Sequence, residues 1–137
     1  MSGRPRFRVA LLAGAALALA ALGACFSEER ATTGLTPGIP CEVPLELIQA
    51  GHTIVAMRDY VFYPDSISVP VGTTVSWVNC APTTEDPHTT TSDTGLWDSG
   101  FLSPGEFFSR EFTQADVYPY HCIPHQAIGM VGTVVVE

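Results

Sequence analysis

From about residue 41 to the end of the chain, apolar residues recur in short runs that turn residues separate. Such runs, rich in β-branched and aromatic residues, are typical of strands, and none keeps a helical apolar period over ten or more residues. Around Trp77, Val75 and Trp77 alternate with small polar residues, which predicts one buried and one solvated face. We expect strands at residues 52–58, 66–69, 73–79, 106–112, 117–122 and 131–136.

Turn residues at 70–72, 103–105 and 114–116 separate these runs. Seven or eight short strands at this spacing predict a single all-β domain with a β-sandwich architecture. One longer irregular stretch, residues 83–94, remains inside the domain. A loop of that length in a small fold is usually functional.

The N-terminus has the pattern of an export signal. Arg4, Arg6 and Arg8 form a cationic start, and residues 9–22 form an uninterrupted run of small and apolar residues. That run is too short to cross about 30 Å of hydrocarbon comfortably, so a permanent transmembrane helix is the weaker interpretation. We therefore predict a signal peptide at residues 1–24 and an exported protein.

The signal ends in Leu22-Gly23-Ala24-Cys25, which resembles a prokaryotic lipoprotein cleavage box. The resemblance implies a lipid on Cys25 and a protein anchored on the extracytoplasmic face of a prokaryotic membrane; the alternative is an ordinary secretory signal. Residues 25–40 are poor in bulky apolar residues and contain Gly and Pro, which predicts a tether ahead of a domain at residues 41–137.

The charge of the chain excludes some partners. Removal of the signal would take away three of the six arginines, and the formal net charge would change from −8 to −11. The chain contains no lysine. A nucleic acid or an anionic membrane surface would repel such a protein, whereas a basic protein partner would not.

The four cysteines divide by context. Cys25 lies in the lipid box and Cys122 lies in a metal-like cluster, which leaves Cys41 and Cys80 as the natural pair. Disulfides are typical of exported proteins. We predict a disulfide that joins the segment before the first strand to the end of the strand that carries Trp77.

The cluster near the C-terminus has the pattern Cys122-x2-His125-x4-Met130, and His88 follows Pro87 in the long irregular stretch. A His2Cys set with a long axial Met is the ligand arrangement of blue-copper electron-transfer sites. Thiolate and thioether suit Cu(I), and imidazole suits both oxidation states. The spacing therefore predicts one copper ion held by His88, Cys122, His125 and Met130.

These residues resemble the plastocyanin, amicyanin and halocyanin group of cupredoxins. The similarity lies in the stretch 120–136, together with Asp86-Pro87-His88, residues 97–100 and residues 73–79. It implies a Greek-key β-sandwich of seven or eight strands, type 1 copper and one-electron transfer. One departure is Thr89, which stands where plastocyanin and azurin have an Asn tied to the copper loop; we expect its hydroxyl to do part of that job.

The resemblance also implies that His125 presents its outer ring edge to a redox partner. Ile123, Pro124, Ala127 and Ile128 would then form an apolar rim around it. A small and transient contact, below about 1,200 Å², suits a carrier that must release its partner quickly. We expect a monomer that alternates between an electron donor and an electron acceptor.

Three other functions are alternatives to electron transfer. A structural zinc domain would use Cys80, His88, Cys122 and His125, but it needs Cys80 free and leaves Met130 without a role. A multicopper enzyme needs more histidines than the four in this chain, so we predict no enzyme activity. The sequence does not exclude a copper carrier that delivers its metal to another protein. His52 and His121 are interpreted as non-ligand histidines.

Overall fold

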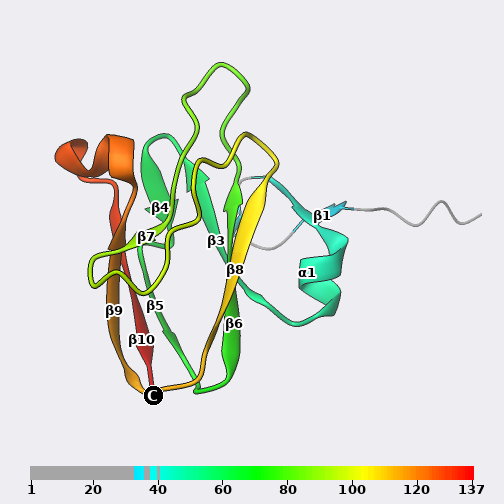
Figure 1. Cartoon of the computed structure of the whole chain (residues 1–137). Helices are drawn as coiled ribbons and strands as arrows, with labels where there is room; N and C mark the ends of the chain where they lie inside the picture. Colours follow the sequence, from blue (N-terminus) through cyan, green and yellow to red (C-terminus); the bar gives the residue numbers. More distant parts are fainter. Residues whose placement is uncertain (1–32, 36–37, 40) are drawn as a thin grey trace, which may run out of the picture.

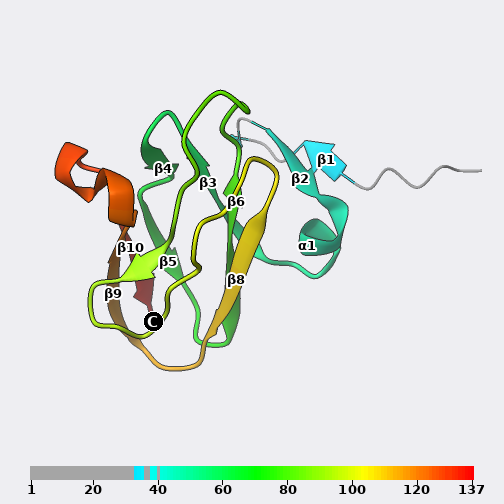
Figure 2. The same ribbon diagram turned by 45° about the horizontal axis from the view of Figure 1, so that its top comes forward.

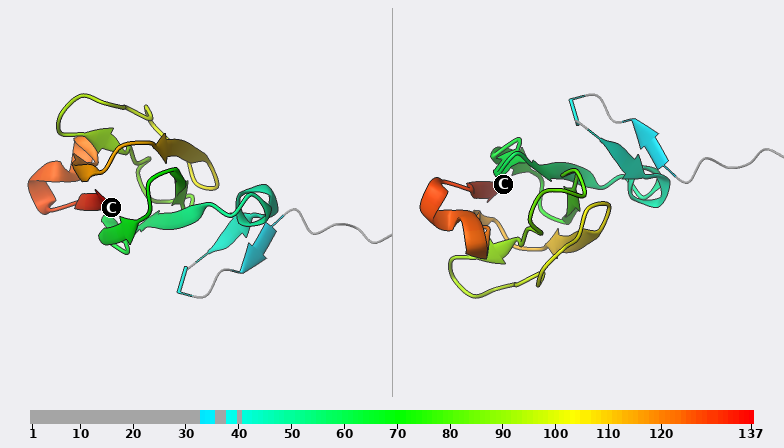
Figure 3. Two further views of the ribbon diagram at one scale, coloured as in Figure 1. Left: turned by 90° about the horizontal axis from the view of Figure 1, so that it is seen from below. Right: turned by 90° about the horizontal axis from the view of Figure 1, so that it is seen from above.

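A computed structural model describes residues 33–35, 38–39 and 41–137, and the predicted signal peptide and Cys25 lie outside them. Eight of the described strands form two four-stranded sheets that face each other (Figure 1, Figure 3). The predicted all-β sandwich is therefore confirmed. In the part of the chain that the structure describes, no helix has the length and apolar character needed to cross a bilayer.

The first sheet contains the C-terminal strand at its centre. Strand β10 pairs in parallel with β5 and antiparallel with β9, and β9 pairs antiparallel with β7. Alternate residues of β10 are buried, which places one face of the sheet against the core. The order across the sheet is β5 (Ser66–Val69), β10 (Val131–Val136), β9 (Asp116–His121) and β7 (Thr91–Ser92).

The second sheet is built around the strand that carries Trp77. Strand β6 pairs in parallel with β3 and antiparallel with β8, and β4 closes a hairpin with β3. The six predicted strands agree with the observed bounds to within one residue, whereas β4 and β7 were not predicted. The order is β4 (Val61–Tyr63), β3 (Thr53–Arg58), β6 (Thr73–Asn79) and β8 (Phe107–Phe112).

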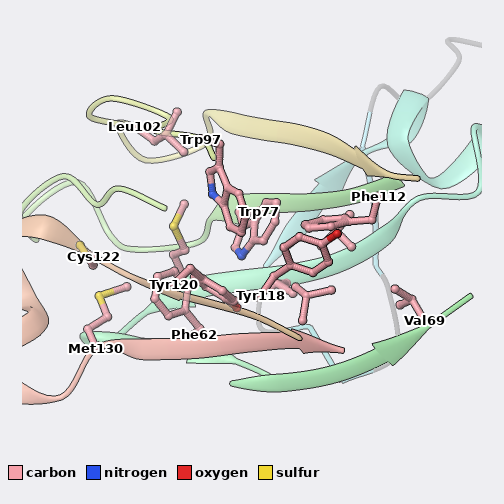
Figure 4. Packing of buried hydrophobic residues seen from close by; sticks show 14 of the residues in the cluster. Phe62, Val69, Trp77, Trp97, Leu102, Phe112, Tyr118, Tyr120, Cys122 and Met130 are labelled. Carbon is pink, nitrogen blue, oxygen red and sulfur yellow. The ribbon is translucent and has the colours of Figure 1, made fainter. Parts of the chain in front are cut away.

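The main core fills the space between the two sheets and is unusually aromatic (Figure 4). The Trp77 ring lies 5.3 Å from the Tyr120 ring and 5.7 Å from the Trp97 ring, measured between centroids. Val75 and Trp77, which the alternation predicts on a buried face, are both in this cluster, together with Phe112. Cys122 and Met130 lie at one end of this cluster, so two of the predicted metal ligands are part of the hydrophobic core.

The strand that carries Trp77 was predicted to have one solvated face. This prediction was wrong, because the outer face of the second sheet is buried. Ser76 and Val78 are both buried, and Val78 packs against residues of a helix and a strand that cover this side of the sheet (Figure 2). The Ser76 hydroxyl is satisfied by Ser109 Oγ at 2.6 Å and by His52 Nδ1 at 2.7 Å. A second hydrophobic cluster lies beneath the cover and consists of Val43, Leu47, Ile54, Ala56, Val78 and Cys80.

The cover consists of β1 (Thr33–Leu35), β2 (Glu42–Pro44) and α1 (Leu45–Gln49). Strands β1 and β2 pair antiparallel, so three residues of the segment predicted as a tether form a strand. The disulfide between Cys41 and Cys80 fastens this cover to the end of β6, as predicted. The short helix α1 was not predicted.

Candidate metal centre

Three buried side chains converge at the end of the sandwich where the short helix after β9 lies (Figure 1). The potential ligand atoms of His88, Cys122 and His125 all lie within 4.8 Å of one another. The two histidine Nδ1 atoms are 3.1 Å apart, and Cys122 Sγ lies 3.4 Å from His125 Nδ1 and 3.8 Å from His88 Nδ1. Residues that are 34 positions apart in the chain are thus brought to one point.

Cys122 and His125 are positioned by a compact turn between β9 and β10. This turn is the 3-10 helix η1 (Ile123–Ile128), which ends at Gly129 with a φ of 93° that favours glycine. The His125 N–H donates to the Cys122 carbonyl at 3.1 Å, and the Cys122 N–H donates to the Met130 carbonyl at 3.0 Å. These backbone bonds fix the segment from Cys122 to Met130 without help from a metal.

Met130 is fully buried immediately before β10 and belongs to the same core cluster as Cys122 (Figure 4). Its N–H donates to the His125 carbonyl at 3.2 Å. Its backbone is therefore tied to His125, and its side chain packs in the core cluster that contains Cys122.

His88 comes from the other sheet, through the loop that follows β6. Its backbone exchanges hydrogen bonds with Leu102, at 3.2 Å and 2.8 Å. The Asn79 side chain braces the base of the loop, because its Nδ2 donates to the Leu102 carbonyl at 2.8 Å and its Oδ1 accepts from the Ala81 N–H at 2.9 Å. The predicted long loop is thus anchored at both ends, and β7 lies within its predicted range.

Thr89 ties the His88 loop to the Cys122 turn in two ways. Its N–H donates to Cys122 Sγ at 3.2 Å, and its hydroxyl accepts from the Ile123 N–H at 2.9 Å. The Thr89 hydroxyl therefore links the loop that carries His88 to the turn that carries Cys122. A hydrogen bond to the sulfur is one of the contacts through which a protein tunes a bound metal.

Burial changes the pKa values of His88 and Cys122. Burial lowers the pKa of His88 below its ordinary value, although the Glu85 carboxylate raises it in part. Burial raises the pKa of the Cys122 thiol, and the Thr89 N–H opposes this rise. Without a cation the site therefore favours a neutral imidazole and a neutral thiol.

Two residues that the sequence analysis missed lie against the histidines. Glu85 Oε1 lies 3.2 Å from His88 Nε2, and the Tyr60 ring lies edge-on to the His125 ring at 4.7 Å. The spacing of three residues between Glu85 and His88 was a signal that could have been used. Tyr60 gave no signal, because it approaches on the hairpin closed by β4, which was not predicted.

The donor set fits copper rather than the zinc alternative. Cys80 is joined to Cys41, so a Cys2His2 set that includes Cys80 is excluded. His121 pairs with Asp93, and His52 pairs with Ser76, as expected for non-ligand histidines. Among the described residues one group of metal-ligating side chains remains, and a buried thiolate with two imidazoles suits copper.

The turn that carries His125 has apolar residues at the surface. Ile123, Pro124, Ala127 and Ile128 are all exposed, whereas His125 in the same turn is buried. Ile128 is 68% exposed, the largest fraction among the bulky apolar residues that are exposed in the described part of the chain. Such large apolar side chains in one place are typical of contact surfaces.

Comparison with known proteins agrees with this chemistry. Residues 49–137 match the family of copper binding proteins described as the plastocyanin/azurin family. The chain is 38% identical over 88 residues to a plastocyanin of Scenedesmus fuscus, covering 56% of this chain and 87% of that protein. It is 31% identical over 128 residues to the amicyanin of Paracoccus denitrificans, covering 90% and 92%.

A solved structure described as a novel purple cupredoxin from Nitrosopumilus maritimus is also similar. The TM-score is 0.55 at 29% sequence identity, covering 62% of this chain and 99% of that protein. The similarity therefore extends from the ligand motif to the whole sandwich.

Proposed function

Because the chain belongs to the plastocyanin/azurin family of copper-binding proteins, we propose that it is an extracytoplasmic one-electron carrier with a single type 1 copper ion. Its plastocyanin and amicyanin relatives are electron carriers of this kind. We assign His88, Cys122, His125 and Met130 as the copper ligands. The observation that carries the proposal is the convergence of the first three, buried and held by backbone hydrogen bonds.

When bound at this site, copper supplies one-electron chemistry by passing between Cu(I) and Cu(II). The role of the chain is to keep one geometry for both states. The Cys122 turn is closed by its own backbone bonds, and Thr89 fastens it to the segment that carries His88. Burial keeps water away from the donor atoms, so little has to reorganise when the charge changes.

The test is a visible absorption spectrum of the full chain after addition of Cu(II). We expect an intense thiolate-to-copper band that reductant bleaches reversibly. The Cys122→Ser variant loses the band, and Met130→Leu changes its position. A matched pair is His125→Ala and His121→Ala, because His121 pairs with Asp93 outside the site and its loss should leave the band intact. A colourless protein would overturn the proposal.

The exposed rim around His125 is proposed as the docking surface for donor and acceptor proteins. A matched pair of variants tests it: Ile128→Arg places a charge in the rim, and Val117→Arg places one near the start of β9. These side chains are 68% and 57% exposed, so neither substitution disturbs the core. We expect slower electron transfer with a partner protein for Ile128→Arg alone. Equal rates for both variants would place the docking surface elsewhere.

Export and lipid attachment at Cys25 are part of the proposal and rest on the sequence alone. Mass spectrometry of the protein from a bacterial membrane fraction should find a lipid-modified Cys25 as the first residue. The Cys25→Ser variant should then move to the soluble fraction. An unmodified N-terminus on the wild-type protein would support an ordinary secretory signal.

We propose no catalytic activity, because two of the four histidines are assigned to one copper ion and the other two have other partners. Delivery of copper to another protein is the alternative to electron transfer. Exchange with a Cu(I) chelator separates them, since a carrier of electrons should retain its copper through repeated oxidation and reduction. Rapid loss of copper to the chelator would favour delivery.

A further inference from the structure

The Glu85 carboxylate lies between the copper site and a neighbouring hairpin. The same oxygen, Oε1, lies 3.2 Å from His88 Nε2 and accepts a hydrogen bond from the Tyr60 N–H at 3.2 Å. The Glu85 side chain is 8% exposed and the His88 side chain is fully buried. An acidic group that contacts the outer nitrogen of a ligand histidine can control both the orientation and the charge of the site.

The hairpin that meets Glu85 has an unfavourable backbone. Asp59 and Tyr60 form the two-residue turn between β3 and β4, and their φ angles are 53° and 60°. Turns of this kind favour Asn, Asp and Gly, so Tyr60 is the residue that is strained at positive φ. In this conformation Tyr60 contacts both Glu85 and the His125 ring, so the turn packs against the site.

The contact with Glu85 fixes the tautomer of His88. A carboxylate only accepts hydrogen bonds, so the neutral His88 ring must carry its proton on Nε2 and leave a lone pair on Nδ1. That lone pair faces Cys122 Sγ and His125 Nδ1. The ring is therefore presented to a metal in the form that can ligate it.

We propose that Glu85 is a positioning residue of the copper site, which holds His88 as the Nε2–H tautomer and, through its negative charge, lowers the reduction potential of bound copper. The second effect rests on the proposed function. A negative charge near the site stabilises Cu(II) more than Cu(I), because the oxidised ion carries the larger positive charge. A buried charge is screened less by water and salt than an exposed one.

The test compares the midpoint potentials of Glu85→Gln and Asp86→Asn. Both variants change the net charge by one unit in adjacent residues, but Asp86 is exposed and Glu85 is the residue that contacts His88. We expect Glu85→Gln to lower the ratio of Cu(II) to Cu(I) affinity about tenfold, which raises the potential by about 59 mV for one electron. Asp86→Asn should give less than half of that rise. Equal shifts, or no shift in Glu85→Gln, would overturn the role of Glu85.

A second measurement uses the copper-free protein and needs no electron transfer. Long-range proton–nitrogen NMR spectra of the wild type should show His88 protonated on Nε2. Glu85→Gln keeps an accepting oxygen and should keep that tautomer, whereas Glu85→Ala should give a mixture. A wild-type His88 protonated on Nδ1 would overturn the positioning role.

The two failures can be told apart. A wild-type protein without a copper band contradicts the proposed function and removes the basis for the effect on potential, while the NMR spectra still judge the contact of Glu85 with His88. A wild-type protein with the band, in which Glu85→Gln and Asp86→Asn behave alike, contradicts the role of Glu85 and leaves electron transfer standing.

Discussion

Gly132 occupies a position at which a single methyl group should disrupt the core beside the copper site. It lies in β10 directly opposite Tyr120 of β9. A Cβ atom at Gly132 would lie 2.5 Å from Tyr120 Oη and 2.9 Å from the Asp65 carbonyl oxygen. Carbon atoms in contact are normally about 3.5–4.0 Å apart, so the ring would have to move by about 1 Å.

The Tyr120 ring has no free space into which it can move. It is 1% exposed, and its centroid lies 4.7 Å from that of Phe62 and 5.3 Å from that of Trp77. Inserting a methylene into a packed core costs about 1–3 kcal/mol. We expect Gly132→Ala to lose about 3 kcal/mol, at the upper end, because a packed ring and a backbone carbonyl both oppose the new atom.

Urea unfolding followed by tryptophan fluorescence measures this loss. The control is Thr133→Ala in the same strand, which should cost no more than about 1 kcal/mol, the span of β-propensity. Tyr120→Phe supplies a double-mutant cycle, since it removes one of the clashing atoms and the Tyr120 hydroxyl has no hydrogen-bond partner among the described residues. Gly132→Ala should cost less in that background. A loss below about 1 kcal/mol for Gly132→Ala would refute the close packing of Tyr120 against β10.

Three further predictions concern stability and metal loading. The Cys41→Ser/Cys80→Ser double variant should lose about 4 kcal/mol in denaturant unfolding, because the disulfide closes a loop with a sequence separation of 39. Thr89→Val should cost about 1–3 kcal/mol, since it leaves the Ile123 N–H without its acceptor; a stability equal to that of wild type would contradict this role. The raised pKa of the Cys122 thiol keeps it protonated at neutral pH, so metal binding must release its proton. Chelator competition should show an apparent copper affinity that increases with pH below that pKa, and a flat profile from pH 6 to 8 would contradict it.

Strands with strong apolar patterns could be predicted from the sequence. The prediction failed for very short strands and for the sheet face that other elements cover. The bounds of β5, β6 and β10 were predicted to the residue. Strand β4 has three residues and β7 has two, which is too little for a period to appear. The outer face of β6 was predicted to be solvated, because the alternating pattern does not reveal that α1 and β2 pack over Val78.

The ligand motif was predictable because its spacing is local. Cys122, His125 and Met130 come from one turn, and the histidine in the long loop was the natural fourth member. Glu85 and Tyr60 were not found, since their roles depend on which hairpin lies beside the loop. The Tyr60 N–H meets Glu85 across 25 residues, and no sequence period reports such a contact.

The position of the disulfide links the outer cover of the fold to the metal site. The loop to His88 departs from β6 at Asn79, and Cys80 is the first residue beyond that strand. The Cys80 N–H donates to the Met57 carbonyl at 2.8 Å, and the Asn79 side chain donates to the Leu102 carbonyl, which in turn accepts from the His88 N–H. The start of the loop is therefore held by the cover, by β3 and by the segment that pairs with His88. The Cys122 turn depends less on the rest of the fold, because most of its hydrogen bonds are internal and Thr89 supplies the two bonds that join it to the His88 loop. It follows that the segment most dependent on the rest of the fold is the one that carries His88, and the cover with its disulfide and Glu85 both act on that segment.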